Sequence, residues 1–226
     1  NIVKNAVSIF KKKHDYLDKN YVKSLIVIVP SKQLIYKEKM PARFGFKIGV
    51  WIDSFLKYAK QQNLIVLFPK KLLETQEKET YFKTDSHWNH YGSYLVYDKT
   101  IDELNKIYHT KLQKIDGLTF SDRITGGLDL SRFLKIDKEK DIHDKDIMWE
   151  TFIDEHIITR CEFLIDKESK LLECQQIKNI ATDVNTKSYY TFNKTALNKK
   201  KLLWIRDSFG VNNSPLYQAT FEEIIQ

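Results

Sequence analysis

Apolar and polar positions along the chain alternate in a way that predicts helices and buried strands in turn. Over residues 2–20, apolar residues recur at helical spacing with Lys and Asp between them, which predicts a first helix. Residues 24–30 form an almost continuous β-branched apolar run, typical of a strand buried on both faces of a parallel sheet. A helix over 52–61 and a second buried strand over 64–68 repeat this order. The alternation predicts an α/β layered fold with parallel strands.

The second half of the chain is less regular. A loop entering a short helix is expected over residues 69–78 and a longer helix over 91–108, whereas 31–49 and 117–134 have the composition of loops. Periodicity is weak and charge is dense over 135–201, with short β-like runs at 163–165 and 189–192. A clear strand returns at 201–205. We expect a single domain over 1–226, a fragment of a longer protein, in which 135–200 is a variable, insert-like region.

Composition excludes several classes of protein. A chain of 226 residues with 42% hydrophobic content can bury one sizeable core, and 7 Gly and 4 Pro are too few for a low-complexity chain. No apolar run is long enough for a membrane-spanning helix, and no signal peptide opens the sequence. The formal charge of +7 comes from 37 basic residues interleaved with 30 acidic ones, a pattern typical of a solvated surface, so we expect no nucleic-acid partner.

The two cysteines, Cys161 and Cys174, leave the cellular compartment open. They can form a disulfide in an extracytoplasmic protein or remain two thiols in a reducing compartment. Neither has the spacing of a metal ligand.

Ser208 is a candidate nucleophile because it follows the strand at 201–205. Ligands of open α/β sheets bind at the carboxyl ends of strands, and a serine there needs only a neighbouring base to become reactive. The alternative is that Ser208 caps the start of a following helix.

Asp85 and His87 supply the base that a serine nucleophile requires. In an extended segment, residues two apart project to the same side, so the Asp85 carboxylate can bond one nitrogen of His87 and stabilise its protonated form. A metal site formed by Asp85, His87 and His90 is the competing interpretation, although zinc requires further ligands. The neighbouring Trp88 and Tyr91 are either core residues or a platform for a sugar ring.

Residues 81–89 (YFKTDSHWN), followed by Tyr91 and Gly92, resemble the Asp-x-His-Trp signature of the alginate O-acetyltransferase family, SGNH-hydrolase-like proteins of bacterial polysaccharide acetylation. Three further blocks match in the order of the family: 29–32 (VPSK) with Tyr36 and Pro41, 126–130 (GGLDL), and 206–209 (RDSF). In the second of these, Leu128 intervenes between the glycine pair and Asp129. The resemblance covers most of residues 24–209 and is weak over 135–201.

The resemblance implies a flavodoxin-like SGNH-hydrolase-like fold, a three-layer sandwich with a mainly parallel central sheet and a permuted order of motifs. It implies that Ser208 is the nucleophile, His87 the base and Asp85 its partner, with no cofactor and no metal. The family acetylates hydroxyls of exported polysaccharide with acetyl groups supplied by a membrane-bound acyltransferase. It works in the periplasm or at the cell surface, so an anchor outside this chain is compatible with it.

These implications assign roles to further residues. The oxyanion of an acyl-transfer reaction needs preorganised N–H donors, for which the backbone of Ser208 and of Gly127 are candidates, although Gly126 and Gly127 also suit a simple turn. Arg206 either orients an acidic sugar or has a structural role. Two other functions stay open: a carbohydrate acetylesterase with the same triad, and a non-catalytic glycan-binding or scaffold protein on the same fold.

Overall fold

The structure is a computed structural model that describes residues 2–41, 50–125, 127–136, 144–150, 157–164, 170–178 and 188–226. The helices, in chain order, are α1 (Ile2–Lys19), α2 (Lys32–Ile35), the 3₁₀ helix η1 (Lys37–Lys39), α3 (Val50–Gln61), α4 (Lys70–Glu74), α5 (His90–Tyr108), α6 (Asp129–Phe133), the 3₁₀ helix η3 (Ser208–Asn213) and α7 (Ser214–Thr220). The strands are β1 (Ile26–Val27), β2 (Val66–Leu67), β3 (Phe120–Thr125), β4 (Asp144–Trp149), β5 (Ile157–Leu164), β6 (Lys170–Lys178), β7 (Ser188–Phe192), β8 (Asn198–Leu203) and β9 (Phe221–Ile225).

Within the described residues the strands form three sheets of different character. β1 and β2 pair in parallel, β3 and β4 pair antiparallel, and a five-stranded sheet has the order β6-β5-β7-β9-β8. In the five-stranded sheet only β8 and β9 are parallel, and the other three pairings are antiparallel. The α/β class is confirmed, but the prediction of a mainly parallel sheet is wrong for this sheet. The three-layer arrangement and the permuted motif order stay predictions.

The antiparallel strands explain why residues 135–201 gave so weak a signal. Side chains of β7 alternate between buried and half-buried positions, as expected for a sheet with one solvated face. Such strands carry charged residues on their open face and lack the long apolar runs that mark a parallel strand. The expected β-like runs at 163–165 and 189–192 overlap β5 and β7, although residue 165 lies outside the described residues.

Other boundaries differ from the sequence expectation. The expected strands at 24–30 and 64–68 pair only over β1 and β2, and the strand expected at 201–205 begins earlier and ends at Leu203. Two segments expected to be loops contain regular structure, since 31–49 holds α2 and η1, and 117–134 holds β3 and α6. The helices expected over 2–20, 52–61, 69–78 and 91–108 are confirmed. None of the helices in the described ranges is both long and apolar enough to cross a membrane.

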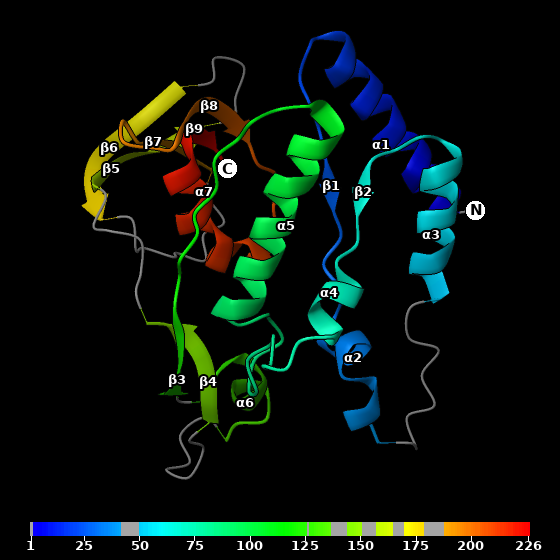
Figure 1. Cartoon of the computed structure of the whole chain (residues 1–226), viewed down its shortest axis with the longest axis vertical. Coiled ribbons are helices and arrows are strands. Elements are labelled where there is room, and N and C mark those ends of the chain that lie inside the picture. The colour runs from blue at the N-terminus through cyan, green and yellow to red at the C-terminus, as the bar shows by residue number, and fades with distance from the viewer. Residues whose placement is uncertain are drawn as a thin grey trace.

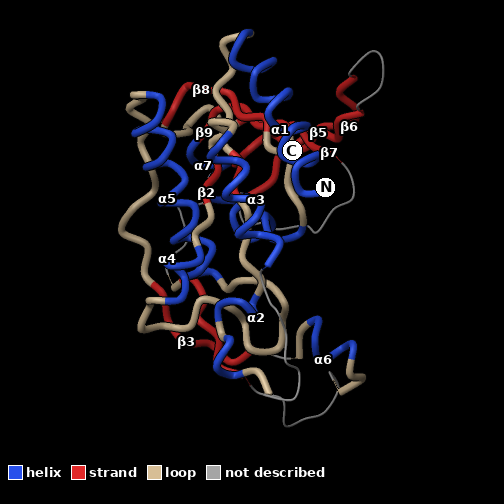
Figure 2. The backbone as a smooth tube through the Cα atoms, turned by 90° about the vertical axis from the view of Figure 1, so that its right-hand side faces the viewer, coloured by secondary structure: helices blue, strands red, loops and turns tan. Residues whose placement is uncertain are grey.

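Helix α5 is the central element that joins the two sides of the molecule (Figure 1). One part of it packs on α7 and β9 in a buried cluster that includes Tyr97, Ile101 and Leu216. The Tyr97 hydroxyl lies 2.6 Å from Oγ1 of Thr220 and accepts a hydrogen bond from the Ile115 backbone N–H at 2.8 Å. Figure 1 shows α1 and α3 beside the β1–β2 pair, on the side that the turned view in Figure 2 brings toward the viewer. These contacts bring the segment that carries Ser208 against the start of α5.

Cys161 and Cys174 form a disulfide between β5 and β6, where they are directly opposed in the antiparallel register. The sequence left this pairing open. The bond closes the β5–β6 hairpin across a sequence separation of 13 residues.

Reduction of this disulfide is expected to lower the free energy of unfolding by about 2–3 kcal/mol, because a cross-link of this loop length restricts the unfolded chain. Denaturant unfolding with and without reductant measures the change. A double variant, Cys161→Ser with Cys174→Ser, should show the lower stability and no response to reductant. Equal midpoints for the oxidised and reduced wild type would contradict the prediction.

Candidate active site

The loop that carries Asp85 and His87 is held at the start of α5. Tyr81 and Trp88 form an isolated antiparallel bridge that closes the loop. Asn89 is the N-cap of α5, and its side-chain oxygen accepts a hydrogen bond from the Gly92 N–H at 2.9 Å. A Cβ at Gly92 would lie 2.1 Å from the Thr80 carbonyl oxygen, so glycine permits the close approach of loop and helix. His87 is therefore presented next to a rigid helix start.

Ser208 is the first residue of η3, five residues after Leu203, where β8 ends. The N-cap of η3 is Asp207, whose carboxylate accepts a hydrogen bond from the Phe209 N–H at 3.0 Å. Capping is thus performed by Asp207 rather than Ser208. The Ser208 hydroxyl is left available for another partner.

His87 connects Ser208 to Asp85 in a continuous chain of hydrogen bonds. Its Nε2 lies 2.8 Å from Oγ of Ser208, and its Nδ1 lies 2.5 Å from Oδ1 of Asp85. The same Asp85 oxygen accepts a hydrogen bond from the His87 backbone N–H at 2.8 Å. Because Nδ1 faces carboxylate oxygens, it carries the proton of the neutral ring, and Nε2 accepts from the Ser208 hydroxyl. The structure brings together the three residues that the sequence singled out.

The charges around His87 favour its protonated form. The hydrogen bond that His87 donates to Asp85 raises the pKa of His87 above its ordinary value. Partial burial opposes this increase, and the charges of Asp85, Asp129 and Asp207 add to it. Burial tends to raise the pKa of Asp85, but the hydrogen bonds from His87 outweigh it and hold that pKa below the ordinary value. The pair is arranged to stabilise an imidazolium beside a carboxylate.

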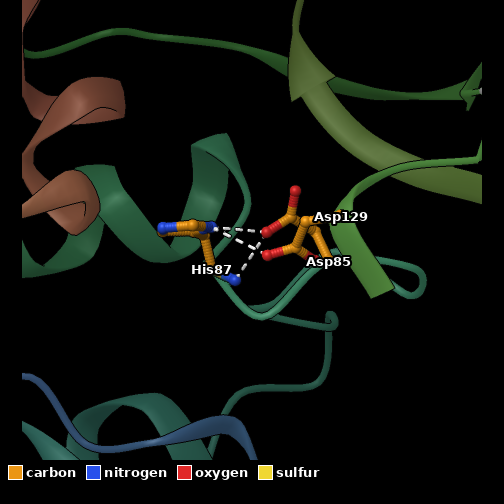
Figure 3. A group of neighbouring side chains, drawn as sticks. All are labelled: Asp85, His87 and Asp129. Atoms are coloured by element: carbon orange, nitrogen blue, oxygen red, sulfur yellow. Dashed lines mark hydrogen bonds and ion pairs between the residues drawn. The ribbon is translucent and has the colours of Figure 1, made fainter. Parts of the chain in front are cut away.

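Asp129 is a residue of the site that the sequence analysis did not assign. Its Oδ2 lies 3.7 Å from Nδ1 of His87, on the side where Asp85 also approaches (Figure 3). The signal was present, because Asp129 belongs to the GGLDL block that matched the family pattern. The spacing of the two blocks in the sequence did not predict that Asp129 lies near His87.

A metal site on Asp85, His87 and His90 is not formed. His90 lies on α5, where its Nδ1 accepts a hydrogen bond from the Trp149 N–H at 3.2 Å and its ring stacks on Trp149. Burial lowers the pKa of His90 to about 4, so this imidazole is neutral. Asp85, His87 and Asp129 do have ligand atoms within 4.8 Å of one another. The carboxylates of Asp85 and Asp129 already accept hydrogen bonds from N–H and O–H donors. This pair of carboxylates suits a protonated histidine as well as it suits a metal cation.

Lys32 fixes the loop from the opposite side. Its ammonium donates to the backbone carbonyl oxygens of Phe82 at 2.6 Å, Lys83 at 2.7 Å and Asp85 at 3.1 Å. Burial lowers the pKa of Lys32, and nearby carboxylates, including that of Asp85, act in the opposite direction. The lysine of the VPSK block therefore holds the backbone on which Asp85 stands.

Lys32→Met is expected to lower the free energy of unfolding by about 1–3 kcal/mol, because three carbonyl oxygens lose a charged donor. Chemical denaturation of the variant measures the loss. Lys37→Met, at an exposed position of η1, is the matched control and should unfold like the wild type. Equal losses in the two variants would show that Lys32 has no special role in the loop.

Trp88 and Tyr91, the two aromatic candidates, lie in different surroundings. Trp88 is only 3% exposed, and its indole N–H donates to the Phe209 carbonyl oxygen at 2.9 Å, so it is a core residue and not a sugar platform. Tyr91 donates its hydroxyl hydrogen bond to Gln76 at 2.8 Å and packs on Phe120.

Arg206 supports the nucleophile loop. Its guanidinium lies over the Trp204 ring, and its Nη1 donates to the Asp207 carbonyl oxygen at 3.2 Å. A Cβ at Gly210 would lie 2.3 Å from Cδ of Arg206, so the arginine packs directly on that glycine. These contacts support the structural role over recognition of an acidic sugar.

The glycine pair is only partly described. Gly126 lies outside the described residues, and Gly127 directly precedes Leu128, the N-cap of α6. The role of Gly127 as an oxyanion donor stays a prediction.

The model of the family described as SGNH hydrolase-like domain, acetyltransferase AlgX, matches residues 1–156. The chain belongs to this family. The matched range contains Asp85, His87 and Asp129 and ends before Ser208, and it confirms the resemblance to the alginate acetyltransferases. No functionally curated protein matches the sequence.

Solved structures support the SGNH hydrolase-like fold. Bacillus cereus PatB1, solved with a sulfonyl adduct, is similar with a TM-score of 0.68 at 15% identity, covering 99% of this chain and 78% of PatB1. A DHHW family protein from Eubacterium siraeum has a TM-score of 0.58 at 16% identity, with 96% and 74% covered. The O-acetyltransferase domain of Pseudomonas putida AlgJ has a TM-score of 0.56 at 14% identity, with 98% and 68% covered. At identities this low, the structural similarity shows a shared fold alone.

Proposed function

We propose that this acetyltransferase-family protein moves acetyl groups to hydroxyls of an exported bacterial polysaccharide through an acetyl-Ser208 intermediate. The observation that carries the proposal is the hydrogen-bond chain from Ser208 Oγ through His87 to Asp85, at 2.8 Å and 2.5 Å. This is the arrangement by which a serine hydroxyl is activated for acyl transfer. The family to which the chain belongs supports acetyl as the group that is transferred.

In the first half-reaction, Ser208 Oγ attacks the carbonyl carbon of an acetyl donor while its proton passes to Nε2 of His87. The resulting imidazolium is stabilised by Asp85, with which His87 already forms a hydrogen bond through Nδ1. Collapse of the tetrahedral intermediate breaks the bond to the leaving group, which takes the proton from His87. The products are acetyl-Ser208 and the protonated leaving group.

In the second half-reaction, a sugar hydroxyl gives its proton to Nε2 of His87 and attacks the acetyl carbonyl carbon. The bond to Ser208 Oγ then breaks, and His87 returns the proton to that oxygen. Water in place of the sugar would give hydrolysis by the same steps. Transfer therefore requires an acceptor site that excludes water.

The developing oxyanion requires N–H donors near Ser208. The backbone N–H of Ser208 is the first of η3, and the first N–H groups of a helix have no partner within it. The N–H of the next residue, Phe209, already bonds the Asp207 carboxylate. We therefore assign the Ser208 N–H to the oxyanion, with Gly127 as the second candidate donor.

We place this reaction outside the cytoplasm, in the periplasm or at the cell surface, with the acetyl donor supplied by a membrane-bound acyltransferase. The Cys161–Cys174 disulfide supports this location, because disulfides persist in oxidising compartments. The similarity to the AlgJ O-acetyltransferase domain supports acetyl transfer as the reaction, and the membrane-bound donor is part of the proposal.

Intact-protein mass spectrometry after brief incubation with an activated acetyl ester tests the proposal. One acetyl group is expected, and peptide mapping should find it on Ser208. A sulfonyl fluoride, the class of electrophile suggested by the sulfonyl adduct of PatB1, should block the labelling. Absence of both adducts, with no release of the leaving group above background, would contradict an enzymatic function and favour a glycan-binding role.

Oligosaccharide acceptors then distinguish transfer from hydrolysis. The acetylated protein is isolated and mixed with candidate polysaccharide fragments, and the appearance of O-acetyl sugar is followed against the release of acetate. Acetyl sugar is the expected product. Acetate alone, at a rate that the sugars do not change, would identify the protein as an esterase.

A further inference from the structure

Asp129 is brought to His87 by the docking of α6 on the loop that carries the histidine. The Leu130 N–H donates to the Thr84 carbonyl oxygen at 3.0 Å, and the Leu128 N–H donates to Oγ1 of Thr84 at 3.3 Å. These bonds join two segments that are distant in the sequence, because Leu128 and Thr84 are 44 residues apart. The first helical residue of α6 thereby presents its carboxylate to the loop.

The carboxylate of Asp129 is engaged at both oxygens. Oδ1 accepts a hydrogen bond from the Ser86 N–H at 2.8 Å, and Oδ2 accepts one from the Ser86 hydroxyl at 2.5 Å. Oδ2 also lies 3.7 Å from Nδ1 of His87 (Figure 3). Ser86 stands directly between Asp85 and His87 in the chain, so fixing it fixes both of its neighbours.

We propose that Asp129 is a positioning residue of this site, a second carboxylate that holds Ser86 in place and stabilises the protonated form of His87. The inference rests on the proposed function for its catalytic meaning. Its physical content, the effect of one carboxylate on one imidazole, can be measured without any substrate.

The charged groups that face His87 come from several elements. Asp85 lies in the same loop and acts most strongly, through its hydrogen bond; Asp129 comes from α6, and Asp207 from the residue before η3. Lys32, from α2, is a nearby cation, and its ammonium donates a hydrogen bond to the carbonyl oxygen of Asp85. Three carboxylates therefore lie around the His87 imidazole, and the ammonium of Lys32 bonds the backbone of the loop that carries it.

This arrangement has a direct consequence for proton transfer. When His87 takes the proton of Ser208, a positive charge forms on the ring with two carboxylates close to Nδ1. Asp129 lowers the free energy of that charged state without itself accepting the proton. The cost is that more of the resting histidine is protonated at a given pH, so the base form appears only at higher pH.

The test is an NMR titration of the His87 imidazole in the full chain, with the signal assigned by its absence in His87→Gln. Asp129→Asn keeps the shape of the side chain and an oxygen for the Ser86 N–H, but it removes the charge. Its His87 pKa is expected to fall by about one unit. Asp122→Asn, at an exposed position of β3, makes the same change in net charge and should leave that pKa unaltered.

Ser86→Ala separates the charge effect from the clamp. It removes the hydroxyl donor from Asp129 and leaves the negative charge facing His87, so the pKa of His87 should stay the same or rise. If Asp129→Asn does not fold by circular dichroism, Asp129→Ser, which also removes the charge, is titrated in its place, and the same fall in the His87 pKa is expected. An unchanged His87 pKa in folded Asp129→Asn, or a lowered one in Ser86→Ala, would overturn the proposal.

The acetylation rate provides a second, independent readout. The rate requires neutral His87, so it rises with pH through the pKa of that residue, and the midpoint should move to lower pH in Asp129→Asn by the same amount as the NMR value. Failure of the proposed function would appear as no labelling of the wild type at any pH, while the NMR shift would still be observed. If Asp129→Asn instead shows the wild-type pH profile of the rate and no change in the His87 pKa by NMR, the role of Asp129 is rejected and the proposed function stands.

Discussion

Ser208→Ala is expected to abolish the acetyl adduct and to lower the rate of acetyl transfer by at least about 10⁴-fold. The reason is that Ser208 Oγ is the atom that forms the new bond, and it lies 2.8 Å from Nε2 of His87, the base that activates it. Intact mass after exposure to the activated ester measures the first effect, and acetyl-sugar formation measures the second. The variant should fold normally, because the exposed hydroxyl is replaced by a smaller group and Asp207 still caps η3.

Ser31→Ala is the matched control for this change. Ser31, like Ser208, is an exposed serine at the start of a short helix, and its side chain makes no capping hydrogen bond. The Ser31→Ala variant should be acetylated on Ser208 at the wild-type rate. An adduct that persists in Ser208→Ala would move the nucleophile to another residue, and peptide mapping would identify it.

Asp85→Asn is expected to lower the rate of Ser208 acetylation by about 10³–10⁴-fold. An asparagine can present its NH₂ group to Nδ1 of His87 and so favour the tautomer with the proton on Nε2, which cannot accept from Ser208. The variant also loses the charge that stabilises the imidazolium. Rates of acetylation across the pH range, measured at saturating ester, report both effects.

The pH profile distinguishes these two contributions. Asp85 raises the pKa of His87, so the wild-type rate should reach its plateau only above the ordinary histidine range. In Asp85→Asn the acid limb should move to lower pH, while the plateau itself falls. A lower plateau with an unmoved acid limb would mean that Asp85 orients the ring without affecting its charge. Asp122→Asn again serves as the control, with neither change expected.

Local signals in the sequence were sufficient for the helices and for the three residues of the hydrogen-bond chain. The spacing of apolar residues predicted α1, α3 and α5 because amphipathic periodicity is a local property. Asp85 and His87 stand two residues apart, so their contact could be anticipated without a fold. The pairing with Ser208, at a separation of 121 residues, depended on the expectation that the serine follows a strand.

Features determined by distant partners could not be read in this way. Antiparallel pairing of β5, β6 and β7 depends on strand neighbours that no local pattern specifies. The proximity of Asp129 to His87 depends on how α6 docks on Thr84, and although the GGLDL block matched the family pattern, its residues do not specify this contact. The burial of Trp88 depends on a cluster that brings together Ile35, Leu73 and Val96, and Phe209 packs against it from the far end of the sequence.

The separation between the base and the nucleophile also bears on how the protein reaches its active form. Asp85, His87 and Asp129 all precede β4 in the sequence, whereas Ser208 follows β8. Only after α7 and β9 pack against α5, with contacts such as Tyr97 to Thr220 at a separation of 123 residues, can Ser208 take its place. Contacts of such long sequence separation form slowly, because the closure of large loops must precede them. The protein is therefore expected to gain its nucleophile in one of the last steps of folding, which would keep an incompletely folded chain from acylating itself or its surroundings.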